Sequence, residues 1–122
     1  MKLPIIVSEH GDISLYDSID KLERDLEPID VKNGEFEVFD AEGKRLTLGT
    51  AIKSTSGLFG IGKINIEMTR VDLKSDGSLD EESLVNLLKN YLVDYVLPKS
   101  LIKKVTLQEL IEVALIKDGY AK

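Results

Sequence analysis

Hydrophobic and polar positions in the first 30 residues predict two short strands followed by one short helix. The apolar run LPIIV, residues 3–7, has the length and β-branched content of a buried strand, and residues 13–16 predict a second strand after the turn SEHGD. A helix is predicted over residues 18–27, because its apolar positions recur at helical spacing and Ser18 is a favoured N-cap residue. We expect Pro28 to end this helix.

The next pattern predicts a β-meander of three strands. Residues 35–39 and 44–53 alternate in hydrophobicity and flank DAEG, which is typical of a turn with Gly43 in the left-handed conformation. The third strand is predicted over residues 63–73. Its alternation changes phase near residues 69–70, which predicts a β-bulge or strong bend there.

The last third of the chain changes to helical spacing. Two helices are predicted near residues 79–96 and 106–118, and Gly119 follows the second as a stop signal. Each helix begins with a capping-box pair at the required spacing: Ser78 with Glu81, and Thr106 with Glu109.

This order of elements predicts the fold class. Strands come mostly first and helices mostly last, which favours an α+β fold. We expect a single domain over residues 1–122, in which two C-terminal helices cover one face of an antiparallel sheet and a short N-terminal helix completes the fold.

Charge is distributed unevenly along this chain, whose net charge is -6. Between residues 9 and 42 there are twelve acidic and three basic residues, a balance of -9. Such a surface disfavours nucleic acid and anionic membrane and attracts basic proteins, although acidic residues also serve solubility alone. The chain has no cysteine, and LPIIV is too short for a signal peptide or a membrane span, so we expect a cytoplasmic protein.

The sequence GLFGIGKI, residues 57–64, satisfies most of the phosphate-binding pattern G-x-x-x-x-G-K-[ST]. Ile64 occupies the position of the magnesium ligand, and the alternating residues that follow predict a strand where a nucleotide-binding loop requires a helix. We therefore interpret the glycines as a hairpin loop that presents Leu58 and Phe59 to a partner or folds back as a lid.

Two further candidate sites are weak. Residues 72–83 resemble a calcium loop, but Lys74 replaces one ligand and Ser83 replaces the bidentate glutamate. Glu9, His10 and Asp12 lie close in sequence and form the third-ranked hypothesis, an acid/base or metal site, which a single imidazole supports poorly. We expect no catalytic residue, no metal and no cofactor.

The sequence YDSIDKLERDLEPIDVKNGEFEVFDAEGKRLTL resembles small acidic bacterial immunity proteins of polymorphic and contact-dependent toxin systems. The resemblance covers residues 13–48. It implies a non-enzymatic protein that binds and neutralises a cognate toxin domain, often a nuclease with a basic surface.

Charge complementarity would speed association with such a partner, and a few apolar anchors would supply affinity. The predicted partner-binding residues are four carboxylates and three apolar side chains: Asp12, Asp17, Asp20, Glu27, Phe39, Leu58 and Phe59. The alternative is a small-ligand-binding or accessory domain with a pocket between sheet and helices.

Overall fold

The computed structural model describes residues 1–56, 63–72, 77–93 and 106–121. The α+β class predicted from the sequence is confirmed: two antiparallel sheets are combined with helices in one domain. Among the described helices, none has the length and apolar character needed to cross a bilayer.

The centre of the body is a three-stranded sheet with strand order β2-β1-β3. Its strands are β1 (Ile5–Glu9), β2 (Asp12–Tyr16) and β3 (Phe36–Phe39), and β1 pairs antiparallel with both neighbours. His10 and Gly11 join β1 to β2 in a two-residue turn, and both have positive φ angles, 51° and 95°. This is the backbone geometry that matches the twist of a tight hairpin.

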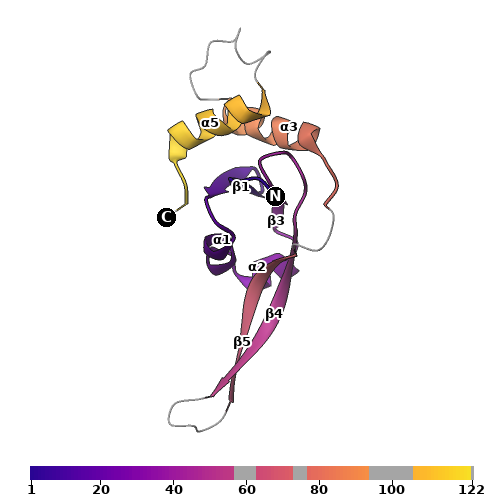
Figure 1. Ribbon diagram of the computed structural model, residues 1–122, viewed down its shortest axis with the longest axis vertical. Coiled ribbons are helices and arrows are strands. Elements are labelled where there is room, and N and C mark those ends of the chain that lie inside the picture. Colours follow the sequence, from indigo (N-terminus) through magenta and orange to yellow (C-terminus); the bar gives the residue numbers. More distant parts are fainter. Residues whose placement is uncertain (57–62, 73–76, 94–105, 122) are drawn as a thin grey trace.

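Helices cover both faces of this sheet (Figure 1). The helices α3 (Glu81–Tyr91) and α5 (Leu107–Asp118) lie on one face, and α1 (Ile19–Asp25) and α2 (Pro28–Lys32) lie near the other. The expectation of a sheet covered on one face is therefore wrong. Alternate residues of the strands enter two separate cores, because side chains of a strand point to opposite faces in turn.

The two cores have different helical partners. The core below α3 and α5 contains Ile6, Leu15 and Phe39 from the sheet, packed with apolar residues of both helices. The core on the side of α1 contains Ile5 and Val38 from the sheet, packed with apolar residues from α1 and from a second sheet.

The second sheet is a two-stranded ribbon that projects from the body (Figure 1). Its strands β4 (Thr47–Ser56) and β5 (Lys63–Asp72) pair antiparallel without interruption, from Thr47 opposite Asp72 to Ser56 opposite Lys63. We call this ribbon the arm. The predicted bulge near residues 69–70 is wrong, since Thr69 and Arg70 pair in regular register with Thr50 and Gly49.

The predicted meander is also wrong, because β3 pairs with β1 and not with β4. The turn between β3 and β4 has hairpin character only at its start, where Phe39 bridges Arg45 and the Leu46 amide donates to the Val38 carbonyl at 2.8 Å. Gly43 has the predicted left-handed conformation, with a φ angle of 90°.

The helix ends test the capping predictions. Ser18 accepts from the Lys21 amide and Thr106 accepts from the Glu109 amide, as predicted, and Gly119 ends α5 with a φ angle of 70°. One capping prediction fails, because Asp80, and not Ser78, caps α3. α1 ends at Asp25, before Pro28, as predicted, and Pro28 is in turn the first residue of α2, a position where its missing N–H costs nothing.

Candidate partner-binding surface

A groove of about 560 Å³ lies between α1 and β5, and we call it the α1–β5 groove. Its lining carries four acidic residues, two basic residues and four others: Asp20, Glu23, Glu27, Glu67, Arg24, Arg70, Leu26, Pro28, Met68 and Thr69. Asp20 and Glu27, both predicted as partner-binding residues, are exposed on its rim. Arg24 and Arg70 are exposed as well, so the groove carries charges of both signs with an excess of carboxylates, and its wall is held by polar contacts between α1 and β5.

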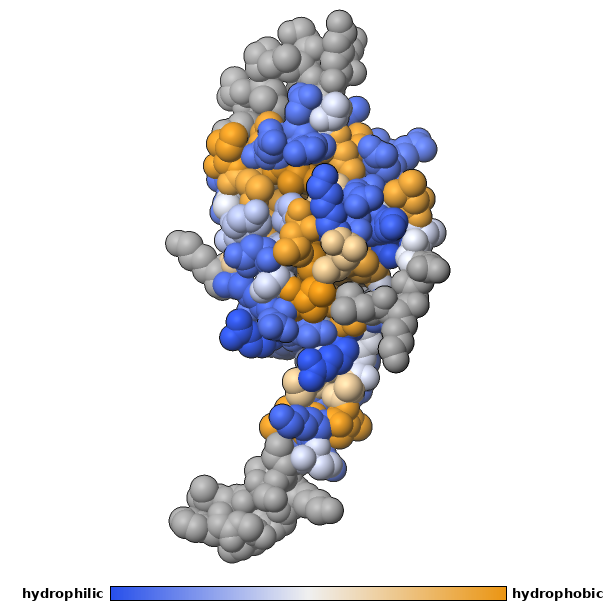
Figure 2. Space-filling model, in the orientation of Figure 1, coloured by the Kyte–Doolittle hydropathy of each residue, from blue (hydrophilic) through white to orange (hydrophobic). Residues whose placement is uncertain are grey.

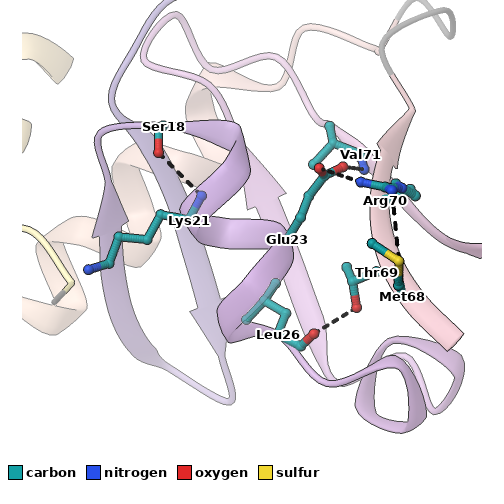
Figure 3. A network of polar contacts seen from close by, with 8 residues as sticks. All are labelled: Ser18, Lys21, Glu23, Leu26, Met68, Thr69, Arg70 and Val71. Carbon is teal, nitrogen blue, oxygen red and sulfur yellow. Dashed lines mark hydrogen bonds and ion pairs between the residues drawn. The ribbon is translucent and has the colours of Figure 1, made fainter. Parts of the chain in front are cut away.

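Figure 3 shows these polar contacts. The carboxylate of Glu23 accepts from the Arg70 guanidinium at 3.2 Å and from the Val71 backbone amide at 2.8 Å. The buried hydroxyl of Thr69 donates to the Leu26 carbonyl, at the end of α1, at 2.7 Å. These bonds satisfy groups at the outer edge of β5 and fix the base of the arm against the body.

A second hollow, of about 260 Å³, opens between the sheet and the two short helices. We call it the Tyr16 pocket. Five carboxylates line it, and the described lining residues include no basic side chain: the carboxylates are those of Glu9, Asp12, Asp25, Glu27 and Asp30. The charged residues described in its lining are thus all acidic.

The pKa of Tyr16 is affected by its burial and by these carboxylates. Its side chain is nearly buried, and burial is the main reason that its pKa is raised above 10.0. The negative charge of Asp25, a hydrogen bond with that carboxylate, and the charge of Glu9 raise the pKa further. The phenol therefore remains protonated at neutral pH.

The structure brings some of the predicted partner-binding residues together. Glu27 lines both hollows, Asp20 lines the α1–β5 groove and Asp12 lines the Tyr16 pocket. Asp17 is exposed but lines neither of them. Leu58 and Phe59 lie outside the described residues.

Phe39 is a correction. It is fully buried in the core below α3 and α5, and the Arg45 guanidinium lies 4.8 Å from the centre of its ring. A side chain with no exposed surface cannot serve as a surface anchor, so the predicted surface position of Phe39 is wrong.

Sequence reasoning did not single out the carboxylates of Asp25, Asp30 and Glu67 as parts of a site. The charge excess of residues 9–42 signalled the first two, but their meeting with Glu9 and Asp12 depends on the way α1 and α2 pack on the sheet. Glu67 comes from the arm, and it forms an ion pair with Lys32 at the end of α2.

The hypothesis of a site made by Glu9, His10 and Asp12 finds little geometric support. Glu9 and Asp12 are opposite each other in the β1–β2 ladder and line the Tyr16 pocket, whereas the exposed His10 ring contacts the Glu35 carboxylate. This hydrogen bond, and the charge of Glu35, raise the pKa of His10 above 6.5. Within the described residues, no group of three carboxylate or imidazole side chains has the arrangement of a metal site.

The two motif resemblances fall partly outside the described residues, at 57–62 and 73–76. The predicted strand after Gly62 is confirmed, since Lys63 begins β5. A nucleotide-binding loop would require a helix at that point.

Comparisons with protein-family models, curated proteins and solved structures find no match for this chain.

Proposed function

We propose that this chain is a non-catalytic immunity protein, which binds a cognate bacterial toxin domain with a basic surface in the cytoplasm and neutralises it. The observation that carries this proposal is the pair of adjoining acidic hollows that share Glu27. Their carboxylates come from the end of β1, the start of β2, α1, α2 and β5.

The Tyr16 pocket supports a cationic partner because its charges are not neutralised by its own lining. Glu9 and Asp12 lie directly opposite each other in the ladder, an arrangement of like charges that destabilises a strand pair. A lysine or arginine entering the pocket would relieve this repulsion and form charge-assisted hydrogen bonds with several carboxylates. The protonated hydroxyl of Tyr16 adds a polar group at the same place.

The α1–β5 groove has a different part in this proposal. Glu23 is already bound to Arg70, and Glu67 is already bound to Lys32, so these charges are partly neutralised within the protein. Asp20 and Glu27 remain on the exposed rim. Exposed charges of both hollows raise the rate of association, and charges in a pocket that closes on binding also slow dissociation.

The functional test is co-expression with the toxin domain captured from the source organism, combined with binding kinetics. The wild-type chain should protect cells, and its association rate should fall as salt rises. The double variant Asp12→Asn/Glu27→Gln should lower the association rate by about threefold or more at low salt, because it removes two charges from the acidic hollows. The matched control is Glu112→Gln/Asp118→Asn, which removes two exposed charges from α5.

Two results would contradict the proposal. Co-expression that fails to protect cells from the captured protein would exclude the immunity function. If the two double variants lowered the association rate equally, the chain would still be a binding protein, but the acidic hollows would be excluded as its recognition surface.

The alternative function is the binding of a small cationic molecule. The α1–β5 groove has a volume of about 560 Å³, within the range of small-molecule sites. A ligand at about 100 times its dissociation constant should stabilise the protein by about 2.7 kcal/mol. A saturable thermal shift with a polyamine, together with no toxin partner, would favour this alternative.

A further inference from the structure

Beyond its base, where α2 packs against β4, the arm presents an open strand edge outside the proposed toxin site. Each of its two strands has a neighbour on one side only, because the sheet has the order β4-β5. The arm also carries exposed apolar side chains: Ile52 is 69% exposed and Ile66 is 47% exposed. Figure 2 shows hydrophobic surface along the arm, separate from that of the body.

The direction of the free backbone groups follows from two hydrogen bonds. The Val71 amide donates to Glu23, away from β4, and the Leu46 amide donates to Val38, away from β5. Since amides alternate in direction along a strand, the N–H and C=O groups of Thr50, Ile52 and Ser54 point outward from the arm. Among the described residues, none forms a backbone hydrogen bond with this edge.

The two edges of the arm are not equally open. The edge of β5 is covered near the body, where Glu23 binds the Val71 amide and Thr69 contacts Leu26. β4 contacts α2 near the body, where Thr50 is half-buried. From Ala51 to Ser54 it is exposed, and the segment from Thr50 to Ser54 contains no proline and no bulge, two devices that usually prevent strand addition.

We propose that the β4 edge binds the same edge of a second copy of this chain, in an antiparallel pair centred on Ile52. This register is self-complementary. It places Ile52 opposite the second Ile52, and Thr50 opposite Ser54, which are an apolar pair and a hydroxyl pair that stabilise neighbouring strands. Lys53, the single charged residue between Thr50 and Ser54, falls opposite Ala51 and not opposite the second Lys53.

Charge also favours the arm as the contact between copies. The acidic residues concentrate on the body, so arm-to-arm pairing does not bring the two acidic faces together. The resulting dimer has a twofold axis and joins the two arms in one four-stranded sheet. An edge contact of this length is at the small end of specific interfaces, and we therefore expect a weak dimer.

Sedimentation and light scattering over a concentration series test this proposal. The wild-type mass should rise from 13.6 kDa towards twice that value between about 10 μM and about 1 mM. Ile52→Pro should remain at 13.6 kDa, because proline removes an outward N–H and leaves the β4–β5 ladder intact. The matched control is Asn65→Pro, which removes an outward N–H from the opposite edge and should dimerise as the wild type does.

Amide hydrogen exchange of the wild type gives a readout that needs no variant. Exchange at Ile52 should slow as concentration rises, whereas exchange at Asn65 should not change. A wild type that remains monomeric at about 1 mM would overturn the proposal. Equal mass behaviour of the two proline variants, or exchange at Ile52 that is independent of concentration, would also overturn it.

Discussion

Replacing Glu23 tests whether the contact between α1 and β5 holds the arm to the body. The Glu23 side chain is only 12% exposed, and its two oxygens bind two different groups of β5. Removing the carboxylate in Glu23→Ala leaves the partly buried Val71 amide without its acceptor. The loss of a hydrogen bond to a charged acceptor costs about 1.5–3 kcal/mol.

The bond with Arg70 adds little to this cost. Arg70 is 50% exposed, and ion pairs with an exposed partner contribute about 0–1 kcal/mol. Glu23→Ala should therefore lower the free energy of unfolding by about 2–3 kcal/mol in total. For a chain of 122 residues, an unfolding entropy of about 0.26 kcal/mol/K converts this loss into a fall in Tm of roughly 8–12 °C.

Two further variants separate the contributions. Glu23→Gln keeps a carbonyl oxygen for the Val71 amide and should cost about 1 kcal/mol. Asp20→Ala is the control, because Asp20 lies on the same helix and the same groove but is exposed and forms no hydrogen bond within the described residues. Urea unfolding measures all three variants. A loss for Glu23→Ala within about 0.5 kcal/mol of the loss for Asp20→Ala would refute the reasoning.

Two other predictions concern the segment before α3 and the pH dependence of the β1–β2 turn. Gly77→Ala should lower the free energy of unfolding by about 1–3 kcal/mol, because an added Cβ would lie 1.7 Å from the Arg45 carbonyl oxygen; Gly49→Ala, which has open space, should change it little. Thermal unfolding of both variants provides the comparison, and equal Tm values would contradict the first prediction. The contact with Glu35 raises the pKa of His10, so its contribution to stability should be complete below pH 6.5 and should be lost as pH rises through the pKa of the folded state. NMR titration should give a His10 pKa above 6.5 that falls in Glu35→Gln, and an unchanged pKa would contradict the assigned cause.

The predictions that succeeded depend on residues close in sequence. Ser18 and Thr106 cap helices whose first turn contains their hydrogen-bond partners, and Gly119 supplies a local backbone conformation. The failed cap shows the limit of local reasoning. Ser78 and Asp80 are both residue types that favour an N-cap position. Asp80 also accepts a hydrogen bond of 2.8 Å from the Arg45 guanidinium, and this contact joins residues 35 positions apart in the sequence.

Strand partners could not be predicted in the same way. The alternation of Phe36 and Val38 with glutamates indicates a strand with one polar face, and this pattern is correct for most of β3. Its last residue, Phe39, breaks the pattern and enters the core on the other face, because helices cover both faces of the sheet. The pairing of β3 with β1 depends on this long-range packing and not on the turn that follows β3.

The charge of the candidate site could be predicted, but its shape could not. The excess of carboxylates between residues 9 and 42 is evident from the sequence alone. The Tyr16 pocket forms only where α1 and α2 place Asp25 and Asp30 over the end of the sheet that carries Glu9 and Asp12. The position of each carboxylate relative to the others is a consequence of tertiary packing.

The two proposed interfaces are independent because they use different elements. The Tyr16 pocket and the α1–β5 groove involve the body and β5, whereas self-association uses the outer edge of β4. A dimer formed through the arms therefore leaves both acidic faces free, and each copy can bind one basic partner. It follows that Ile52→Pro should leave the association rate with a toxin domain unchanged, and that Asp12→Asn/Glu27→Gln should leave the dimer mass unchanged. Binding kinetics and sedimentation on the same two proteins measure both effects. A changed association rate in Ile52→Pro, or a changed dimer mass in Asp12→Asn/Glu27→Gln, would show that the interfaces overlap.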